Sequence, residues 1–188
     1  MGEEKKRLPV GLENFEQIIN DNYYYVDKTG LISELIRNGG MVNLFTRPRR
    51  FGKTLNMSML EHFFSIERDQ SIYDGLEISK NKKLCEEYMG KYPVISISLK
   101  GINAATYEDA FDFAVQIMKN VAGKMQFLLE SDALSDYDKS EYKKLLDSGM
   151  SKAVFCSGLK ILSELLEKHY GTKVVLLIDE YDVPLAKA

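Results

Sequence analysis

The sequence is poor in several residue types that mark specialised protein classes. Its 188 residues include no tryptophan, four prolines and two cysteines. The cysteines, Cys85 and Cys156, are far apart and lack the spacing of metal ligands. We interpret them as buried thiols in a reducing compartment rather than as a disulfide. No internal repeat or low-complexity linker divides the chain, which is long enough for one domain with a hydrophobic core.

Long apolar runs and a strong excess of one charge are also missing. No run approaches the length of a membrane span, and the N-terminal segment MGEEKKRLPVGLENF lacks the apolar stretch of a signal peptide. The net charge of −3 creates no overall positive field for nucleic acid, so any anion site must be local. Since 45% of the residues are hydrophobic and 28% are charged, we expect a globular protein. Because neither a signal peptide nor a membrane span is indicated, we expect it to be cytoplasmic and without a membrane partner.

Segments of helical and strand-like pattern alternate along the chain. The expected helices share apolar residues at helical spacing and cover 12–20, 30–40, 54–65, 106–130 and 140–169, with a mixed-charge surface helix within 80–91. The expected strands are apolar runs at 41–46, 92–101 and 173–182. Apolar strands separated by helices indicate an α/β fold with a mostly parallel sheet covered on both faces.

The segment FTRPRRFGKTLNMSML, residues 45–60, resembles a phosphate-binding loop between a strand and a helix. The full Walker A pattern is G-x-x-x-x-G-K-[ST], and Gly52, Lys53 and Thr54 match its last three positions. Gly52 would let the backbone approach the phosphates, Lys53 would bridge the β- and γ-phosphates, and Thr54 would ligate Mg²⁺. The position of the first glycine holds Arg47 instead.

This loop is also unusually basic. Arg47, Arg49, Arg50 and Lys53 place four cations in seven residues, while Pro48 removes one backbone donor. We expect Arg49 and Arg50 to supplement the backbone amides in binding phosphate. The alternative is a solvated basic turn that precedes an amphipathic helix.

A second motif lies at the end of the third expected strand. In VVLLIDEYD, Asp179 and Glu180 follow an apolar run, and ligands of parallel sheets bind at that end of the strands. Asp179 would hold Mg²⁺ through water, and Glu180 would orient and polarise the attacking water as a general base. Alone, the pair could be a strand that ends in solvated acids. Together with Gly52–Thr54 on another strand–helix unit, it favours a nucleotide site.

The stretches LPVGLENF, YYYVDKTGLI, LFTRPRRFGKTLNMSML, PVISISLKG and LLIDEYDVPL resemble the predicted AAA-ATPase-like family over nearly the whole chain. In that family an arginine-rich loop is usual. The resemblance implies a three-layer α/β/α P-loop NTPase fold that carries an additional catalytic glutamate, here Glu180. Longer members often continue into a restriction-endonuclease-like nuclease domain, which nothing here matches. Contact with nucleic acid would therefore need such a downstream domain.

The resemblance also divides the chain into an N-terminal, adenine-side segment, 1–40, and a P-loop core, 41–188. The segment YVDKTGLISELI is similar to the box that lies near the adenine in related ATPases. It implies that residues 25–29 approach the base or ribose, and that Asp27 contacts the nucleotide. Two alternatives stay open: Tyr23, Tyr24 and Tyr25 are strand or core aromatics, and Asp27 caps the helix that begins near Thr29.

The resemblance further implies the strand order 5-1-4-3-2, and the chain stops after the third, Walker B, strand. The fourth strand, with its sensor residue, would follow Ala188, so we expect an incomplete P-loop core with a gap in the sheet. A second copy or the rest of the chain would fill this gap. We expect weak nucleotide binding and little turnover from these residues alone.

The sequence therefore predicts an ATP-binding P-loop domain that binds Mg-ATP and hydrolyses it in the full-length protein. Lys53 and Glu180 would be catalytic, Arg49, Arg50, Gly52, Lys53, Thr54 and Asp27 would bind nucleotide, and Thr54 and Asp179 would bind the metal. The choice of ATP over GTP rests on the resemblance. The alternatives are a nucleotide switch that does not hydrolyse ATP, and a module whose basic loop binds nucleic acid. The two histidines, His62 and His169, are interpreted as structural.

Overall fold

The chain divides into two compact units, Met1–Tyr92 and Pro93–Ala188. The computed structural model describes residues 6–46, 48, 51–66, 68–102 and 106–182. None of the helices in these ranges combines the length and apolar composition needed to cross a membrane. Each unit has buried side chains of its own.

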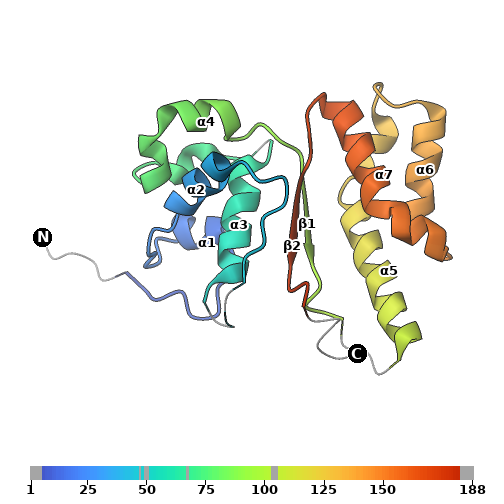
Figure 1. The fold of residues 1–188 in the computed structure, drawn as a ribbon, viewed down its shortest axis with the longest axis horizontal. Helices are drawn as coiled ribbons and strands as arrows, with labels where there is room; N and C mark the ends of the chain where they lie inside the picture. Colours follow the sequence, from blue (N-terminus) through green and yellow to red (C-terminus); the bar gives the residue numbers. More distant parts are fainter. Residues whose placement is uncertain (1–5, 47, 49–50, 67, 103–105, 183–188) are drawn as a thin grey trace, which may run out of the picture. The chain divides into compact units, whose positions relative to one another are not determined.

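The first unit is helical in its described residues (Figure 1). Its α-helices are α1 (Phe15–Asn20), α2 (Gly30–Asn38), α3 (Lys53–Phe64) and α4 (Lys82–Tyr88). Two short 3₁₀ helices, η1 (Gln70–Tyr73) and η2 (Glu77–Lys80), connect α3 to α4. All four helices agree with the expected segments. Helix α2 ends where predicted, at Gly39, whose φ of 60° is a left-handed conformation favourable for glycine.

Aromatic side chains form the centre of the first unit. Phe15 on α1, Phe63 on α3 and Tyr73 on η1 are buried, and the Tyr73 ring lies 5.3 Å from Phe15 and 5.4 Å from Phe63. The Tyr73 hydroxyl donates a buried hydrogen bond of 2.7 Å to the carbonyl oxygen of Met59. These contacts fix α1 and η1 against the helix that follows the basic loop.

The prediction of a strand at 41–46 is wrong. These residues form a loop, and most of their side chains are exposed, including Val42 at 90%. A buried strand needs hydrogen-bonding neighbours, and no described strand pairs with this segment. The Asn43 side chain instead donates to the Gly40 carbonyl at 2.9 Å, so a local turn competes with an extended conformation.

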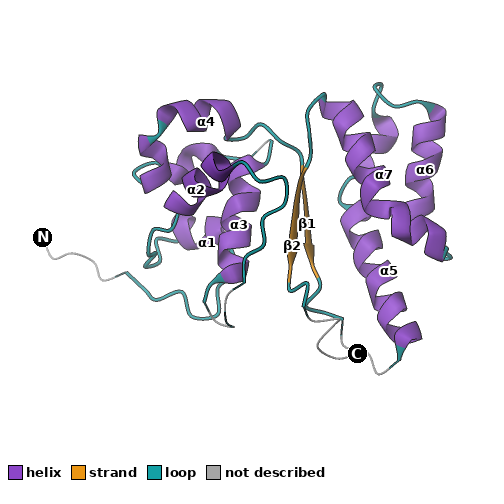
Figure 2. Ribbon diagram, viewed as in Figure 1, coloured by secondary structure: helices purple, strands orange, loops and turns teal. Residues whose placement is uncertain are grey.

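The second unit contains the two remaining expected strands, each shorter than predicted. Strand β1 (Val94–Ser98) and strand β2 (Val175–Asp179) form a parallel pair in the register Val94↔Val175 to Ser98↔Asp179. Figure 2 shows them as the strands of the described chain. The strand order implied by the resemblance places these two strands side by side, and this neighbour relationship is confirmed.

The helices of the second unit are α5 (Tyr107–Gly123), α6 (Asp136–Leu146) and α7 (Lys152–Tyr170), with a 3₁₀ helix, η3 (Gln126–Glu130), after α5. The prediction of a single helix over 140–169 is wrong, because the chain turns between Leu146 and Lys152. Asp147 accepts a hydrogen bond from the Gly149 N–H at 2.7 Å, and Ser151 caps the start of α7. Such side-chain bonds to the backbone favour a turn over a continuous helix.

The three helices and β1 share one hydrophobic core (Figure 1). Ile95 and Ile97 of β1 are buried in it. Their register partners on β2, Leu176 and Ile178, are 43% and 38% exposed.

The combination of helices with a parallel pair of strands confirms the predicted α/β class. The three-layer P-loop arrangement stays a prediction.

Candidate functional site

The basic loop ends at a glycine in a left-handed conformation. Gly52 has φ 73° and ψ 26° and directly precedes α3, which favours a residue without Cβ. Its carbonyl accepts the Asn56 N–H at 3.0 Å and so begins the helical hydrogen bonding. Lys53 and Thr54 occupy the first turn and are half-buried. The chain therefore turns sharply at the glycine and continues as a helix, which matches the second half of the strand–loop–helix motif, whereas residues 41–46 before the loop are not a strand.

The N-terminus of α3 has no side-chain cap among the described residues. The first N–H groups of a helix lack partners within the helix and carry partial positive charge, which makes them anion-binding groups. This end of α3 can accept a phosphate or another anion. Arg49 and Arg50, which were expected to help, lie outside the described residues, as does Arg47.

Asp27 lies in a network of hydrogen bonds at the start of α2. Its Oδ1 accepts from the Thr29 N–H at 2.8 Å and from the Thr29 hydroxyl at 2.7 Å. Its Oδ2 accepts from the backbone N–H of Glu77 at 2.7 Å. Burial on its own would raise the pKa of the Asp27 carboxyl, but these hydrogen bonds together lower it. Both oxygens accept hydrogen bonds within the protein, from Thr29 and from Glu77, while the start of α2 has no side-chain cap among the described residues.

Asp179 combines burial with an unpartnered oxygen at the end of β2. Its side chain is 9% exposed, and Oδ1 accepts from the Glu180 N–H at 2.9 Å. Oδ2 is buried and has no hydrogen-bond partner among the described residues. Buried carboxylate oxygens are normally paired, or they coordinate a metal. A Mg²⁺ ion or one of its bound waters fits this oxygen, since Mg²⁺ prefers carboxylate ligands.

Glu180 follows Asp179 in a strained backbone conformation. Its φ of 55° is left-handed, although glutamate has a Cβ that disfavours this region. Strain of this kind often occurs at functional positions. The conformation ends β2 abruptly and leaves Glu180 half-buried after the last paired residue of the strand.

The candidate residues belong to both compact units. Gly52, Lys53 and Thr54 lie in the first, and Asp179 and Glu180 lie in the second. No group of three or more His, Cys, Asp or Glu side chains in the described parts of the chain could hold a metal ion. A Mg²⁺ ion at Asp179 would depend on few protein ligands and on substrate phosphates, as it does at many phosphate-transfer sites.

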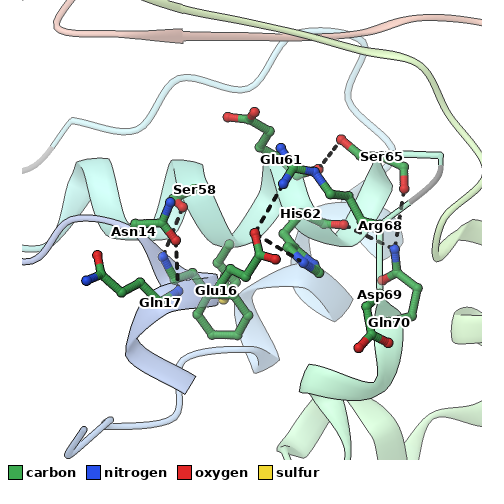
Figure 3. Close-up of polar contacts among 12 residues, drawn as sticks. Asn14, Glu16, Gln17, Ser58, Glu61, His62, Ser65, Arg68, Asp69 and Gln70 are labelled. Atoms are coloured by element: carbon green, nitrogen blue, oxygen red, sulfur yellow. Dashed lines mark hydrogen bonds and ion pairs between the residues drawn. The ribbon is translucent and has the colours of Figure 1, made fainter. Parts of the chain in front are cut away.

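The sequence did not indicate the surroundings of His62 on α3, which Figure 3 shows. The side chain is 4% exposed, and neither ring nitrogen has a hydrogen-bond partner among the described residues. Its Nε2 lies 4.0 Å from Oε2 of Glu16, which is paired with Arg68 at 3.1 Å. Burial lowers the pKa of His62, although the Glu16 carboxylate acts in the opposite direction.

The comparisons with known proteins bear directly on these residues. The family model described as "Predicted AAA-ATPase" matches residues 9–188. The chain belongs to the predicted AAA-ATPase family. The match includes both Gly52–Thr54 and Asp179–Glu180, and it confirms the resemblance seen in the sequence.

One curated relative is an uncharacterized protein of the vnfD 5′ region in Azotobacter chroococcum mcd 1. It is 30% identical over 184 residues, which are 96% of this chain and 30% of the relative. The chain thus spans about a third of the length of this relative. No solved structure matches the chain.

Proposed function

We propose that the chain is the nucleotide-binding part of an ATPase that binds Mg-ATP. The observation that carries the proposal is the left-handed Gly52 at the start of α3, which no described side chain caps, followed by Lys53 and Thr54. Membership of the predicted AAA-ATPase family supports the choice of ATP as the ligand. In this proposal Lys53 binds the terminal phosphates, and the first N–H groups of α3 bind the remaining phosphate oxygens.

The metal and water would be bound by three further residues. Thr54 would ligate Mg²⁺ and Asp179 would hold it through water, and the buried Asp179 oxygen without a hydrogen-bond partner among the described residues supports its role. Bound Mg²⁺ would neutralise charge on the phosphates during their transfer. Glu180 would orient and deprotonate the attacking water as a general base. Single substitutions in each compact unit test these roles separately.

Titration of labelled ATP in the presence of Mg²⁺ tests the binding part. Lys53→Ala should weaken binding at least tenfold, because an ammonium–phosphate contact is a charge-assisted hydrogen bond. The matched control is Lys83→Ala on α4, an exposed lysine of the same unit. Equal binding by both variants would reject the loop as a phosphate site. Steep salt dependence without a preference for triphosphate would point instead to the nucleic-acid alternative.

Hydrolysis is tested by Glu180→Gln, which keeps the size of the side chain and removes the base. In the full-length protein, ATP binding should persist, while phosphate release should fall by about two orders of magnitude or more. If the variant hydrolysed ATP at the wild-type rate, Glu180 would not be the general base. Binding without turnover in the wild-type full-length protein would favour the nucleotide switch.

A further inference from the structure

The side chain of Lys28, just before α2, lies beside the glycine of the basic loop. A Cβ atom built on Gly52 would be 3.6 Å from the Nζ atom of Lys28. Both residues belong to the first unit, so this proximity is a property of one compact body. The motif around Gly52 does not include Lys28, and the sequence predicted that its segment approaches the base or ribose.

The ammonium of Lys28 is not neutralised by a neighbouring carboxylate in the described parts of the chain. Lys28 is exposed, and the ion pairs found in those parts do not include it. The sequence adds Lys53 and three arginines at 47, 49 and 50 to the same loop. Uncompensated cations near a helix N-terminus raise the local concentration of anions, and their mutual repulsion falls when an anion binds.

The backbone on both sides of Lys28 is held in place. Asp27 binds the N–H of Glu77, and the Thr29 hydroxyl accepts the N–H of Ile78 at 3.1 Å. Thr29 is completely buried. The side chains next to Lys28 are therefore used to attach this corner to η2, and the lysine side chain remains available at the loop.

A second attachment links the same corner to α3. The Tyr25 hydroxyl accepts the backbone N–H of Lys28 at 3.3 Å, and its oxygen lies 3.5 Å from the sulfur of Met59. Because Met59 and Gly52 are on or next to the same helix, Tyr25 couples the position of Lys28 to that of the loop. Such fixed geometry lowers the entropy cost of forming a contact with a ligand.

We propose that Lys28 is a second phosphate-binding lysine of this loop, and that it contacts the terminal phosphates of a nucleoside triphosphate rather than the base. This inference rests on the proposed ATP binding. It compensates for Pro48, which removes one backbone N–H group from those that the loop offers to phosphate. A lysine ammonium supplies up to three donors without a constraint on backbone conformation.

The test compares ligands that differ in phosphate number. Full-chain wild type, Lys28→Met, Lys28→Arg and Lys53→Ala are titrated with Mg²⁺ and ATP, ADP, AMP or inorganic triphosphate. Lys28→Met should weaken ATP and triphosphate binding about tenfold, since it removes an exposed charge-assisted hydrogen bond, and should leave AMP binding unchanged. Lys28→Arg should restore most of the affinity. Lys83→Met is the matched control and should bind like the wild type.

The outcomes separate this inference from the proposed function. If Lys53→Ala loses ATP binding and Lys28→Met does not, the inference is overturned and the ATP site stands. An equal loss for ATP, ADP and AMP in Lys28→Met would mean a base or ribose contact and would also overturn it. Absence of ATP binding in the wild type would overturn both. Unchanged thermal unfolding of Lys28→Met ensures that a loss of binding is not a loss of fold.

Discussion

The carboxylate of Asp27 accepts the backbone N–H of Glu77 at 2.7 Å, although 50 positions separate the two residues. The same carboxylate binds the N–H and hydroxyl of Thr29 at the start of α2. One side chain therefore joins the start of a helix to the start of η2. This corner carries Lys28, so its stability bears on the proposed phosphate site.

We expect Asp27→Ala to lower the free energy of unfolding of the first unit by about 1–2 kcal/mol, because three hydrogen bonds to a carboxylate are lost. Since folding lowers the pKa of Asp27 from 3.8, its contribution is present above that value and is lost as the pH falls through the folded pKa. Urea unfolding at pH 7 and pH 3 measures both effects. Asp74→Ala, an exposed acid of the same unit, is the control.

Burial of His62 predicts a loss of stability in mild acid. Folding lowers the pKa of His62 below 6.5, so the unfolded chain binds a proton more readily than the folded one in the window just below 6.5. The melting temperature should fall as the pH decreases through this window. The charged groups that face His62 are Glu16, Glu61, Arg68 and Asp69, from α1, α3 and the loop after α3.

A His62→Phe variant should show a weaker pH dependence between pH 7 and pH 5, because phenylalanine cannot take up a proton and fits among aromatic neighbours. Differential scanning fluorimetry across this range gives the answer. Equal slopes for wild type and His62→Phe would show that another group is responsible.

The left-handed backbone at Glu180 predicts an unusual order of stability among its variants. Glu180→Gly should be more stable than Glu180→Ala by about 1 kcal/mol, because only glycine avoids the clash of a Cβ at a φ of 55°. At exposed Asp112 within α5 the same pair should show the reverse order, since alanine is favoured in helices. Chemical denaturation of the four variants measures this. If Glu180→Ala were more stable than Glu180→Gly, the result would contradict the strained conformation.

The close approach of α5 to α7 at Gly158 predicts a size limit in the second core. A Cβ on Gly158 would lie 3.1 Å from the Sδ and Cε atoms of Met118. Gly158→Ala should change stability by less than about 1 kcal/mol, because the flexible end of Met118 can move and alanine favours the helix. Gly158→Leu should cost about 1–3 kcal/mol by overpacking.

The double variant Gly158→Leu with Met118→Ala should lose less free energy of unfolding than the two single variants lose together. The smaller residue at 118 leaves space for the larger one at 158. Gly123→Leu, where a Cβ would meet no atom within 4 Å, is the control for the loss of glycine itself. Additive effects would mean that Met118 does not limit the space at Gly158.

Local sequence signals predicted the elements whose ends are determined by nearby residues. The helix that ends at Gly39 and the helix that begins after Gly52 follow from glycines in left-handed conformations. The strands 94–98 and 175–179 follow from apolar runs. The break between α6 and α7 was missed because Asp147 and Ser151 form hydrogen bonds that compete with a helix, and apolar periodicity does not register them.

The sequence by itself determined the family, the glycine turn into α3 and the acids at the end of β2, because each depends on residues that are adjacent in the chain. Only the tertiary structure decided that 41–46 is a loop, that His62 is buried without a hydrogen-bond partner among the described residues, and that Lys28 lies at Gly52. These features depend on which distant segments pack together. Pairing partners and neutralising charges come from those segments, and no local pattern encodes them.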